Sequence, residues 1–307
     1  MTGDFEQGRV TLATGVELDV VDIGPRDAPV LIFLHGFPES HRTWRNQLLH
    51  FTDRFRCIAP DQRGYRGSSK PQDAASYTPD KLIADIFALA DALDVAEFTI
   101  VGHDWGGAIA WGVALGGQPG GLHPQWAGRV KRAVIANAPH PGIFGRLLAT
   151  DKVQRAASQY IRVFRDPAND ALIEEQGIAG ILALAFEGRT PSGGLQPADE
   201  IGRLLKDWED RDACRGMINW YRGSPMTVPA MEEPYAEPPA APFPKLTVPT
   251  LVIWALDDVA LPPCNLDGME DLVPNLSVVK VPGCGHFVPW EDPDAVNAAM
   301  DDFLART

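Results

Sequence analysis

Residues Thr99 to Leu115 read TIVGHDWGGAIAWGVAL, and this stretch decides the fold. A short apolar run ends at Gly102, an acid follows at Asp104, and small residues continue from Gly106. The pattern predicts a strand, a sharp turn and a helix, because glycine permits the close backbone approach that such a turn needs. A G-x-Nuc-x-G turn of this kind exposes its middle residue at the carboxyl end of a sheet. We therefore predict that Asp104 is a nucleophile.

Short apolar runs on both sides of this turn predict a mostly parallel sheet. The expected strands are Val30–Leu34, Arg56–Ala59, Phe98–Val101, Val130–Ala136, Thr250–Trp254 and Leu276–Val281. Between and after them, Leu82–Leu93, Gly106–Leu115 and Pro293–Leu304 have helical spacing. Strands that alternate with helices are typical of parallel βαβ units, so we expect an α/β core with helices flanking a twisted sheet.

A helical segment interrupts this alternation. From about Phe144 to Tyr221 only helical periodicity is found, as in Val153–Phe164. The expected domains are a core formed by residues 1–140 and 246–307 and an inserted all-helical cap, residues 141–245. Binding sites often lie between two such modules.

Residues 116–128, GGQPGGLHPQWAG, form a long loop rich in glycine and proline between a predicted helix and a predicted strand. Most such loops have about two to six residues. The loop is most simply a surface insertion. It could also form the rim of an active-site mouth or an oligomer contact, and the sequence leaves these roles open.

Composition excludes several classes of partner. The chain has 307 residues, 45% of them apolar, and a net charge of −14, which argues against nucleic acid and against an anionic membrane surface. Its four cysteines have no metal-ligand spacing, and no apolar run reaches the length of a signal peptide or a membrane span. We therefore expect a cytoplasmic protein without a metal, and the sequence does not choose between a monomer and a homo-oligomer.

A carboxylate at the nucleophile position predicts a particular reaction. A carboxylate suits attack on a saturated carbon that carries a leaving group, and the product is an alkyl ester of Asp104. Water must then hydrolyse this ester, which requires a base and an oxyanion hole. The backbone N–H groups of Phe37, in a tight turn after a predicted strand, and of Trp105 are the natural donors. We expect His35, in the same turn, to be structural.

The base and its orienting acid are predicted near the end of the chain. His286 lies in a glycine-rich loop after the last predicted strand, and Asp257 and Asp258 follow the preceding strand. One of these acids should hold the imidazole, and spacing alone does not choose between them. The order nucleophile, acid, histidine is that of α/β-hydrolases. We expect the other histidines (His41, His50, His103, His123 and His140) to be structural or on the surface.

From about residue 10 to residue 305, the chain resembles the α/β-hydrolase-fold epoxide hydrolases. The motifs that carry the resemblance are HGFPES at 35–40, Gly64-Tyr65 with Ser68-Ser69, GHDWGG at 102–107, NAPHP at 137–141 and Gly285-His286. In this family the orienting acid matches Asp258. Two cap tyrosines of the family donate hydrogen bonds to the epoxide oxygen. Tyr160 matches one, through its spacing to Phe164 and Asp166-Pro167, and Tyr221 matches the other, within Asn219-Trp-Tyr-Arg222.

The resemblance implies an epoxide hydrolase that converts a small-molecule epoxide and water into a vicinal diol. Asp104 would form the covalent alkyl ester, and water activated by His286 would hydrolyse it. No cofactor is expected, because strain in the epoxide ring supplies the driving force.

Related chemistry offers alternatives. Haloalkane dehalogenases share the turn around Asp104, but they commonly hold the halide with a side-chain amide where this chain has Phe37, which has no donor. Fluoroacetate-type dehalogenases have an arginine where this chain has Trp105. A serine esterase would need serine at position 104. A non-catalytic binding protein of the same fold is a further alternative, although the sequence lacks no part of the apparatus.

Overall fold

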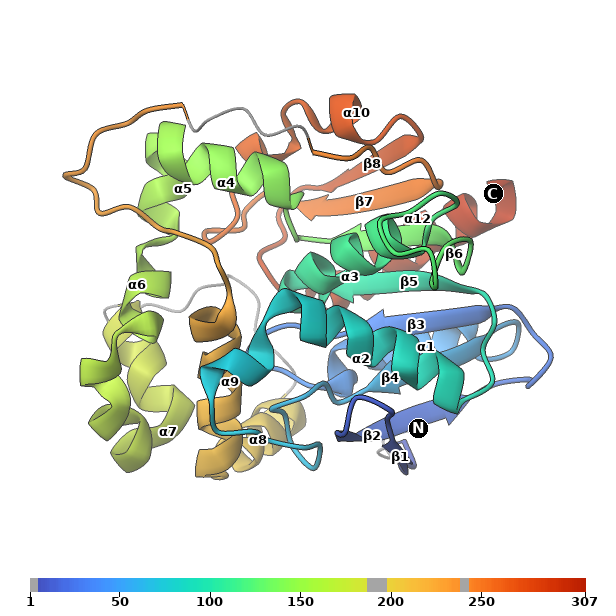
Figure 1. The fold of residues 1–307 in the computed structure, drawn as a ribbon, viewed down its shortest axis with the longest axis horizontal. Helices are drawn as coiled ribbons and strands as arrows, with labels where there is room; N and C mark the ends of the chain where they lie inside the picture. The colour runs from blue at the N-terminus through green and yellow to red at the C-terminus, as the bar shows by residue number, and fades with distance from the viewer. Residues whose placement is uncertain (1–4, 187–197, 238–242) are drawn as a thin grey trace.

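The computed structural model describes residues 5–186, 198–237 and 243–307. Over these residues the chain forms an eight-stranded sheet with the order β1-β2-β4-β3-β5-β6-β7-β8 (Figure 1). The pairs β1–β2 and β2–β4 are antiparallel, and the remaining neighbours are parallel. The strands are β1 (Gly8–Thr11), β2 (Glu17–Ile23), β3 (Val30–Leu34), β4 (Arg56–Pro60), β5 (Phe98–His103), β6 (Val130–Ala136), β7 (Thr250–Ala255) and β8 (Leu276–Val281).

The six strands predicted from apolar runs are all present, within one or two residues at their ends. The sequence did not indicate β1 and β2. β1 lies at the sheet edge and is largely exposed, and β2 alternates buried with less buried residues, so neither has a continuous apolar run. The predicted α/β class is confirmed.

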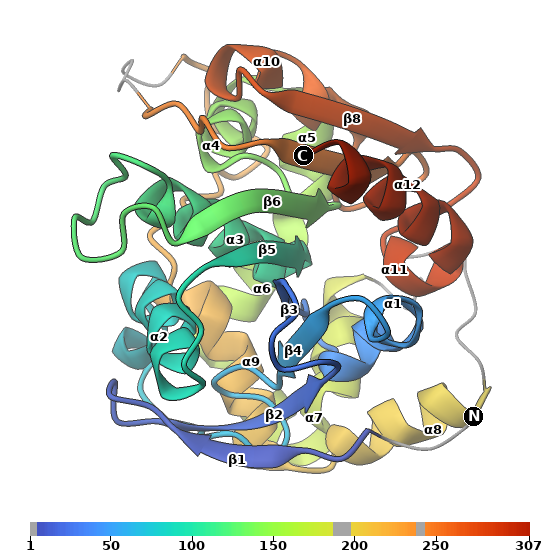
Figure 2. The ribbon, with the colours of Figure 1, turned by 90° about the vertical axis from the view of Figure 1, so that its right-hand side faces the viewer.

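Helices cover both faces of the sheet. α2 (Pro79–Ala92) and α3 (Asp104–Gly117) pack on one face, whereas α1 (Arg45–Phe51) and α12 (Pro293–Arg306) pack on the other (Figure 2). The short helices α10 (Met269–Leu272) and α11 (Val288–Glu291) and the 3-10 turns η1 (His41–Trp44), η2 (Ala74–Tyr77) and η4 (Pro263–Leu266) complete the core.

β3 shows why the central strands are continuous apolar runs. Ile32 and Leu34 pack in the cluster shared with α2 and α3, and Leu31 and Phe33 pack in the cluster shared with α1 and α12. All four side chains are buried. Since successive side chains of a strand point to opposite faces, a strand covered on both sides needs apolar residues at every position.

A helical cap region lies between β6 and β7 in the chain. Its helices are α4 (Pro141–Thr150), α5 (Lys152–Ala157), α6 (Gln159–Arg165), α7 (Asp170–Ala185), α8 (Ala198–Asp207) and α9 (Arg211–Gly223), with the 3-10 turn η3 (Pro167–Asn169). Figure 1 shows them beyond the carboxyl ends of the parallel strands. Residues 187–197 and 238–242 of the predicted cap lie outside the described part, and the boundaries at 141 and 245 stay a prediction.

One predicted helix is divided in the structure. The stretch Val153–Phe164 has continuous helical spacing, but α5 and α6 meet at Ser158, which leaves the helical conformation. The Ser158 hydroxyl accepts a hydrogen bond of 2.8 Å from the amide of Gln154, and the same amide donates to the carbonyl of Ala260 in the core. This buried polar contact ties α5 to the core, which periodicity does not encode. No described helix combines the length and apolarity of a membrane span.

Glycines bring α3 close to the sheet. A Cβ atom at Gly106 would lie 2.2 Å from the carbonyl oxygen of Leu34 in β3, and a Cβ at Gly102 would lie 2.4 Å from the carbonyl oxygen of Gly106. These contacts are with backbone atoms, which cannot rotate away. The close packing that the sequence predicted for these two glycines is therefore present, and it fixes where α3 begins.

We expect Gly106→Ala to destabilise the protein by about 3 kcal/mol or more, because its methyl group overpacks against backbone. Gly202→Ala is the matched control, since Gly202 is an exposed helical glycine and a methyl group at this position would have no atom within 4 Å. It should stabilise the protein by up to about 1 kcal/mol. Urea unfolding measures both changes. Equal midpoints for Gly106→Ala and the parent protein would contradict the packing described for α3.

Candidate active site

Asp104 occupies the turn between β5 and α3 in a strained conformation. Its φ angle is 51°, in the left-handed region that residues other than glycine seldom adopt. Its carboxylate Oδ1 accepts a hydrogen bond of 2.7 Å from the backbone N–H of Phe37. Because Asp104 is the first residue of α3, the helix dipole also favours its negative charge. The turn presents this carboxylate to a cavity beneath the cap.

His286 lies between two carboxylates. Its Nδ1 is 2.7 Å from Oδ2 of Asp258, and its Nε2 is 3.4 Å from Oδ2 of Asp104. Asp258 is buried, whereas the neighbouring Asp257 is exposed. The structure therefore brings Asp258, and not Asp257, to the imidazole. The three residues follow β5, β7 and β8, whose carboxyl ends meet on one side of the sheet.

Asp258 is held by a set of donors. Its Oδ1 accepts from the backbone N–H groups of Ala260 and Leu261, both at 2.9 Å, and its Oδ2 accepts from the side-chain amide of Asn137 at 2.8 Å. Asn137 in turn accepts from the N–H of Ala255 at 2.8 Å. The sequence prediction gave Asn137 no role. Its position directly after β6, at the edge where sites form in α/β sheets, is the signal that could have found it.

His103 contacts the backbone of His286 through a hydrogen bond. Its Nε2–H donates to the carbonyl oxygen of His286 at 2.8 Å, and its Nδ1 is 3.5 Å from a carboxylate oxygen of Glu39. The other oxygen of Glu39 accepts from the indole N–H of Trp290 at 2.7 Å. His103 is fully buried, which is consistent with the structural role predicted for it. The contacts make His103 a positioning residue for the loop that carries His286.

Charges within this group shift the two key pKa values. Burial on its own raises the pKa of Asp104, but the hydrogen bond and charge of His286 and the charge of His103 outweigh it, so the pKa is lowered. Burial lowers the pKa of His286, but the charges of Asp258 and Asp104 and their hydrogen bonds raise it well above its ordinary value. In the resting site a protonated imidazole therefore lies beside the ionised carboxylate of Asp104.

Two tyrosines of the cap line the same cavity as Asp104. Tyr160 comes from α6 and Tyr221 from α9, and their ring centroids are 6.2 Å apart. The Tyr221 ring lies edge-on to the ring of Phe37 and to that of Trp105, each at 5.1 Å. Burial, together with the charge of Asp104, raises the pKa of both phenols, so both keep their protons at neutral pH.

Two backbone N–H groups, those of Phe37 after β3 and Trp105 in α3, are the predicted donors of the oxyanion hole. The N–H of Phe37 already contacts the Asp104 carboxylate, and the N–H of Trp105 lies in the first turn of α3, where helix N–H groups lack intrahelical partners. His35 lies behind the turn that contains Phe37. Its Nε2 accepts from the N–H of Gln62 at 3.1 Å, and burial lowers its pKa to about 4, so it is a neutral structural residue.

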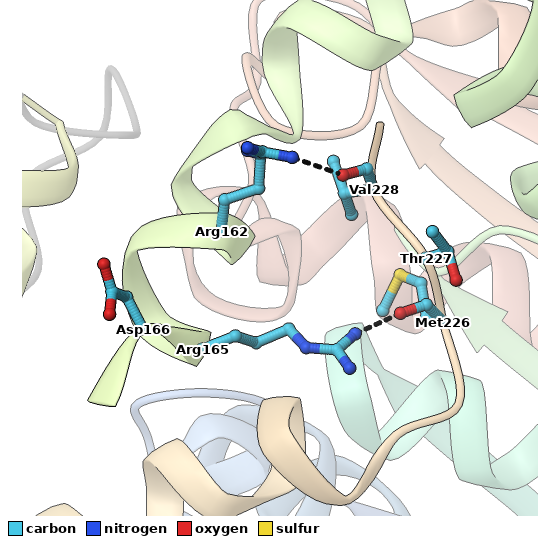
Figure 3. A pocket seen from close by; sticks show the side chains of 6 residues that line it. All are labelled: Arg162, Arg165, Asp166, Met226, Thr227 and Val228. Atoms are coloured by element: carbon cyan, nitrogen blue, oxygen red, sulfur yellow. Dashed lines mark hydrogen bonds between the residues drawn. The ribbon is translucent and has the colours of Figure 1, made fainter. Parts of the chain in front are cut away.

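The cavity has a volume of about 500 Å³, and its walls come from core and cap. One wall is the segment from Ser224 to Thr227. Figure 3 shows Arg162 and Arg165 of α6 reaching to the carbonyl groups of Val228 and Met226 at a second hollow, which shares Met226 and Thr227 with the cavity. None of the predicted site residues lines this second hollow. Among the described residues, no three or more His, Cys, Asp or Glu side chains are grouped to hold a metal ion.

This chain is similar to known proteins of one family along most of its length. The model of the alpha/beta hydrolase family matches residues 31–299. A solved structure from metagenomes of hot environments, described among novel epoxide hydrolases of the alpha/beta hydrolase superfamily, is 63% identical with a TM-score of 0.93, over 99% of this chain and 100% of that chain. A mutant epoxide hydrolase from Bacillus megaterium, in complex with a naphthyloxy propanediol product, is 30% identical with a TM-score of 0.80, over 97% of this chain and 100% of that chain.

Epoxide hydrolase 3 of Mus musculus is 30% identical over 295 residues, which are 95% of this chain and 75% of that protein. The family match spans most of the chain, and these relatives cover both core and cap. The chain therefore belongs to the α/β-hydrolase family, and the predicted resemblance to its epoxide hydrolases is confirmed.

Proposed function

We propose that this protein is an epoxide hydrolase that works through a covalent ester on Asp104. The observation that carries the proposal is a carboxylate in the strained turn after β5 that shares one cavity with two protonated tyrosines, Tyr160 and Tyr221. The names of the relatives support the same reaction. The core, residues 1–140 and 246–307, would supply the nucleophile and base, and the cap, residues 141–245, would supply the proton donors.

In the first step, the ionised Asp104 attacks a ring carbon from the side opposite the oxygen. The carbon–oxygen bond of the ring breaks as an ester bond to Asp104 forms. The released oxygen takes a proton from Tyr160 or Tyr221, because an alkoxide is far more basic than a phenolate. The phenolate left behind regains its proton from the imidazolium of His286. This last transfer leaves the imidazole neutral.

The second step hydrolyses the ester. Esterification removes the charge of Asp104, which is one cause of the raised pKa of His286, so the imidazole now holds a proton less strongly. Neutral His286, oriented by Asp258, takes a proton from water as the water attacks the ester carbonyl. The N–H groups of Phe37 and Trp105 stabilise the oxyanion. Collapse breaks the bond to the substrate oxygen, which takes the proton of the carboxylic acid formed on Asp104, so that the diol is released and the carboxylate and imidazolium are restored.

Carbon–halogen chemistry is less well supported by the same site. A departing halide needs hydrogen-bond donors, and the Phe37 side chain, which packs against Tyr221 and Phe164, provides none. An oxygen leaving group needs a proton, and two phenols line the cavity. The tyrosines are thus the feature that favours an epoxide.

A single turnover in water labelled with heavy oxygen tests the covalent step. With enzyme in excess over an aryl or alkyl epoxide, the first diol should carry no label, because its new oxygen comes from Asp104. The label should instead enter the Asp104 carboxylate, where mass spectrometry of the peptide detects it. A diol that is labelled in the first turnover would show direct attack by water and would refute the ester mechanism.

Tyr221→Phe should slow ring opening by roughly a hundredfold, at the low end of general acid catalysis, because Tyr160 remains. Tyr65→Phe is the matched control, since Tyr65 packs in the core against His35 and Trp220. It should leave the rate of ring opening within about twofold of the parent, as its hydroxyl donates no proton in the mechanism. Stopped-flow fluorescence of the ester-forming phase gives both rates. If Tyr221→Phe forms the ester at the parental rate, Tyr221 is not a proton donor.

A further inference from the structure

The cavity at Asp104 is elongated along one helix. Asp104, Ala108, Gly112 and Leu115 all line it, and their spacing of three or four residues places them on one face of α3. A helix rises about 1.5 Å per residue, so Leu115 lies roughly 16 Å from Asp104 along the axis. The cavity therefore extends well beyond the space that the three atoms of an epoxide ring need.

The far end of the cavity is formed by the Gly/Pro-rich loop, residues 116–128. Leu122 and His123 of this loop line the cavity. The loop is anchored, because the side chain of Gln118 donates to the carbonyl of Lys245 at 3.0 Å and accepts from the N–H of Thr247 at 2.7 Å. The ring of Trp126 also stacks on Phe87 at 4.2 Å. Of the roles that the sequence leaves open, the rim of an active-site mouth is the one that the placement of Leu122 and His123 favours.

The chemistry of the lining changes along the cavity. Its titratable side chains are Asp104, Tyr160 and Tyr221 at one end and His123 at the other. The lining residues between the ends include Pro79, Ile83, Ala108 and Leu115, which are apolar. A charged substituent would lose its hydration here without gaining a partner, whereas each buried methylene group strengthens binding by up to about fourfold.

Gly112 lies near the middle of this apolar section. A Cβ atom at this position would lie 2.4 Å from Cδ1 of Ile83, which also lines the cavity. A larger side chain at position 112 must therefore push Ile83 aside. Glycine therefore lets Ile83 pack against α3, and a side chain at position 112 would displace Ile83, which lines the passage from Asp104 to the loop.

We propose that the substrate is an epoxide with an extended, uncharged apolar substituent, which lies along α3 from Asp104 to Leu122, and that Gly112 determines how long this substituent can be. This inference rests on the proposed epoxide hydrolase function. It adds the substrate class and assigns the loop of residues 116–128 to substrate selection.

Terminal epoxides that carry ethyl, butyl, hexyl and decyl chains test the proposal through kcat/KM. The parent enzyme should favour the longer chains. Gly112→Leu should lower kcat/KM for the decyl epoxide by at least about tenfold and leave the ethyl epoxide within about twofold, because only a long chain reaches position 112. The double variant Gly112→Leu/Ile83→Ala should restore much of the lost kcat/KM for the decyl epoxide, because alanine at position 83 leaves room for the larger side chain at position 112.

Substitutions at two other glycines test where the alkyl chain of the substrate lies. Gly202→Leu, on the exposed face of α8, should change no rate. Gly145 lines the cavity on α4, and Gly145→Leu should also leave the dependence on chain length unchanged. If Gly145→Leu, and not Gly112→Leu, removes the preference for long chains, the substituent lies along α4 and the proposal is wrong. An equal loss on all four epoxides in Gly112→Leu also contradicts it.

Leu122→Trp keeps the test independent of the folding of Gly112→Leu. Leu122 is 60% exposed, so a larger ring there should be tolerated, yet it should narrow the far end and slow only the decyl epoxide. A decyl rate unchanged in Leu122→Trp would exclude the loop from substrate selection. Failure of the proposed function itself is distinguishable, because the parent enzyme would then hydrolyse none of the four epoxides.

Discussion

The backbone of Asp104 is the constraint on which the rest of the site depends. Its φ of 51° turns the chain sharply from β5 into α3, and the glycines at 102 and 106 let the helix lie against the sheet. The turn exposes the carboxylate at the point where the loops after β7 and β8 bring Asp258 and His286. A strained residue persists only where its surroundings over-determine it, and here backbone packing and the N–H of Phe37 both do so.

Electrostatics follow from that geometry. One imidazole lies within hydrogen-bond reach of Asp258 and 3.4 Å from Asp104, so the two negative charges share one positive charge in a buried site. Each carboxylate stabilises the imidazolium, and the imidazolium keeps Asp104 ionised although burial opposes its charge. In the mechanism that we propose, loss of one carboxylate charge on ester formation is what releases the proton. His286 can then change from a proton store into a base.

Local motifs allowed much of this site to be predicted from sequence. The turn around Asp104, six of the eight strands and the helical insert each have a signature within a short window of residues. What could not be predicted depends on contacts between distant residues: Asn137 reaches Asp258 across 121 positions, and Gln154 reaches Ala260 across 106. The choice between Asp257 and Asp258 likewise depends on which one is buried. The role that we propose for residues 116–128 could not be predicted either, because it depends on Leu122 and His123 lining the same cavity as residues of α3.

The shared proton is tested most directly by an NMR titration of the His286 ring in the parent protein and in Asp104→Asn, with His286→Gln used to assign its signals. Asparagine resembles the esterified aspartate in shape and lack of charge. The parent ring should stay protonated well above the ordinary histidine pKa of 6.5, because both carboxylates favour the cation. In Asp104→Asn its pKa should fall measurably, since only Asp258 remains. Identical titration midpoints in the two proteins would contradict the coupling between Asp104 and His286 on which the mechanism rests.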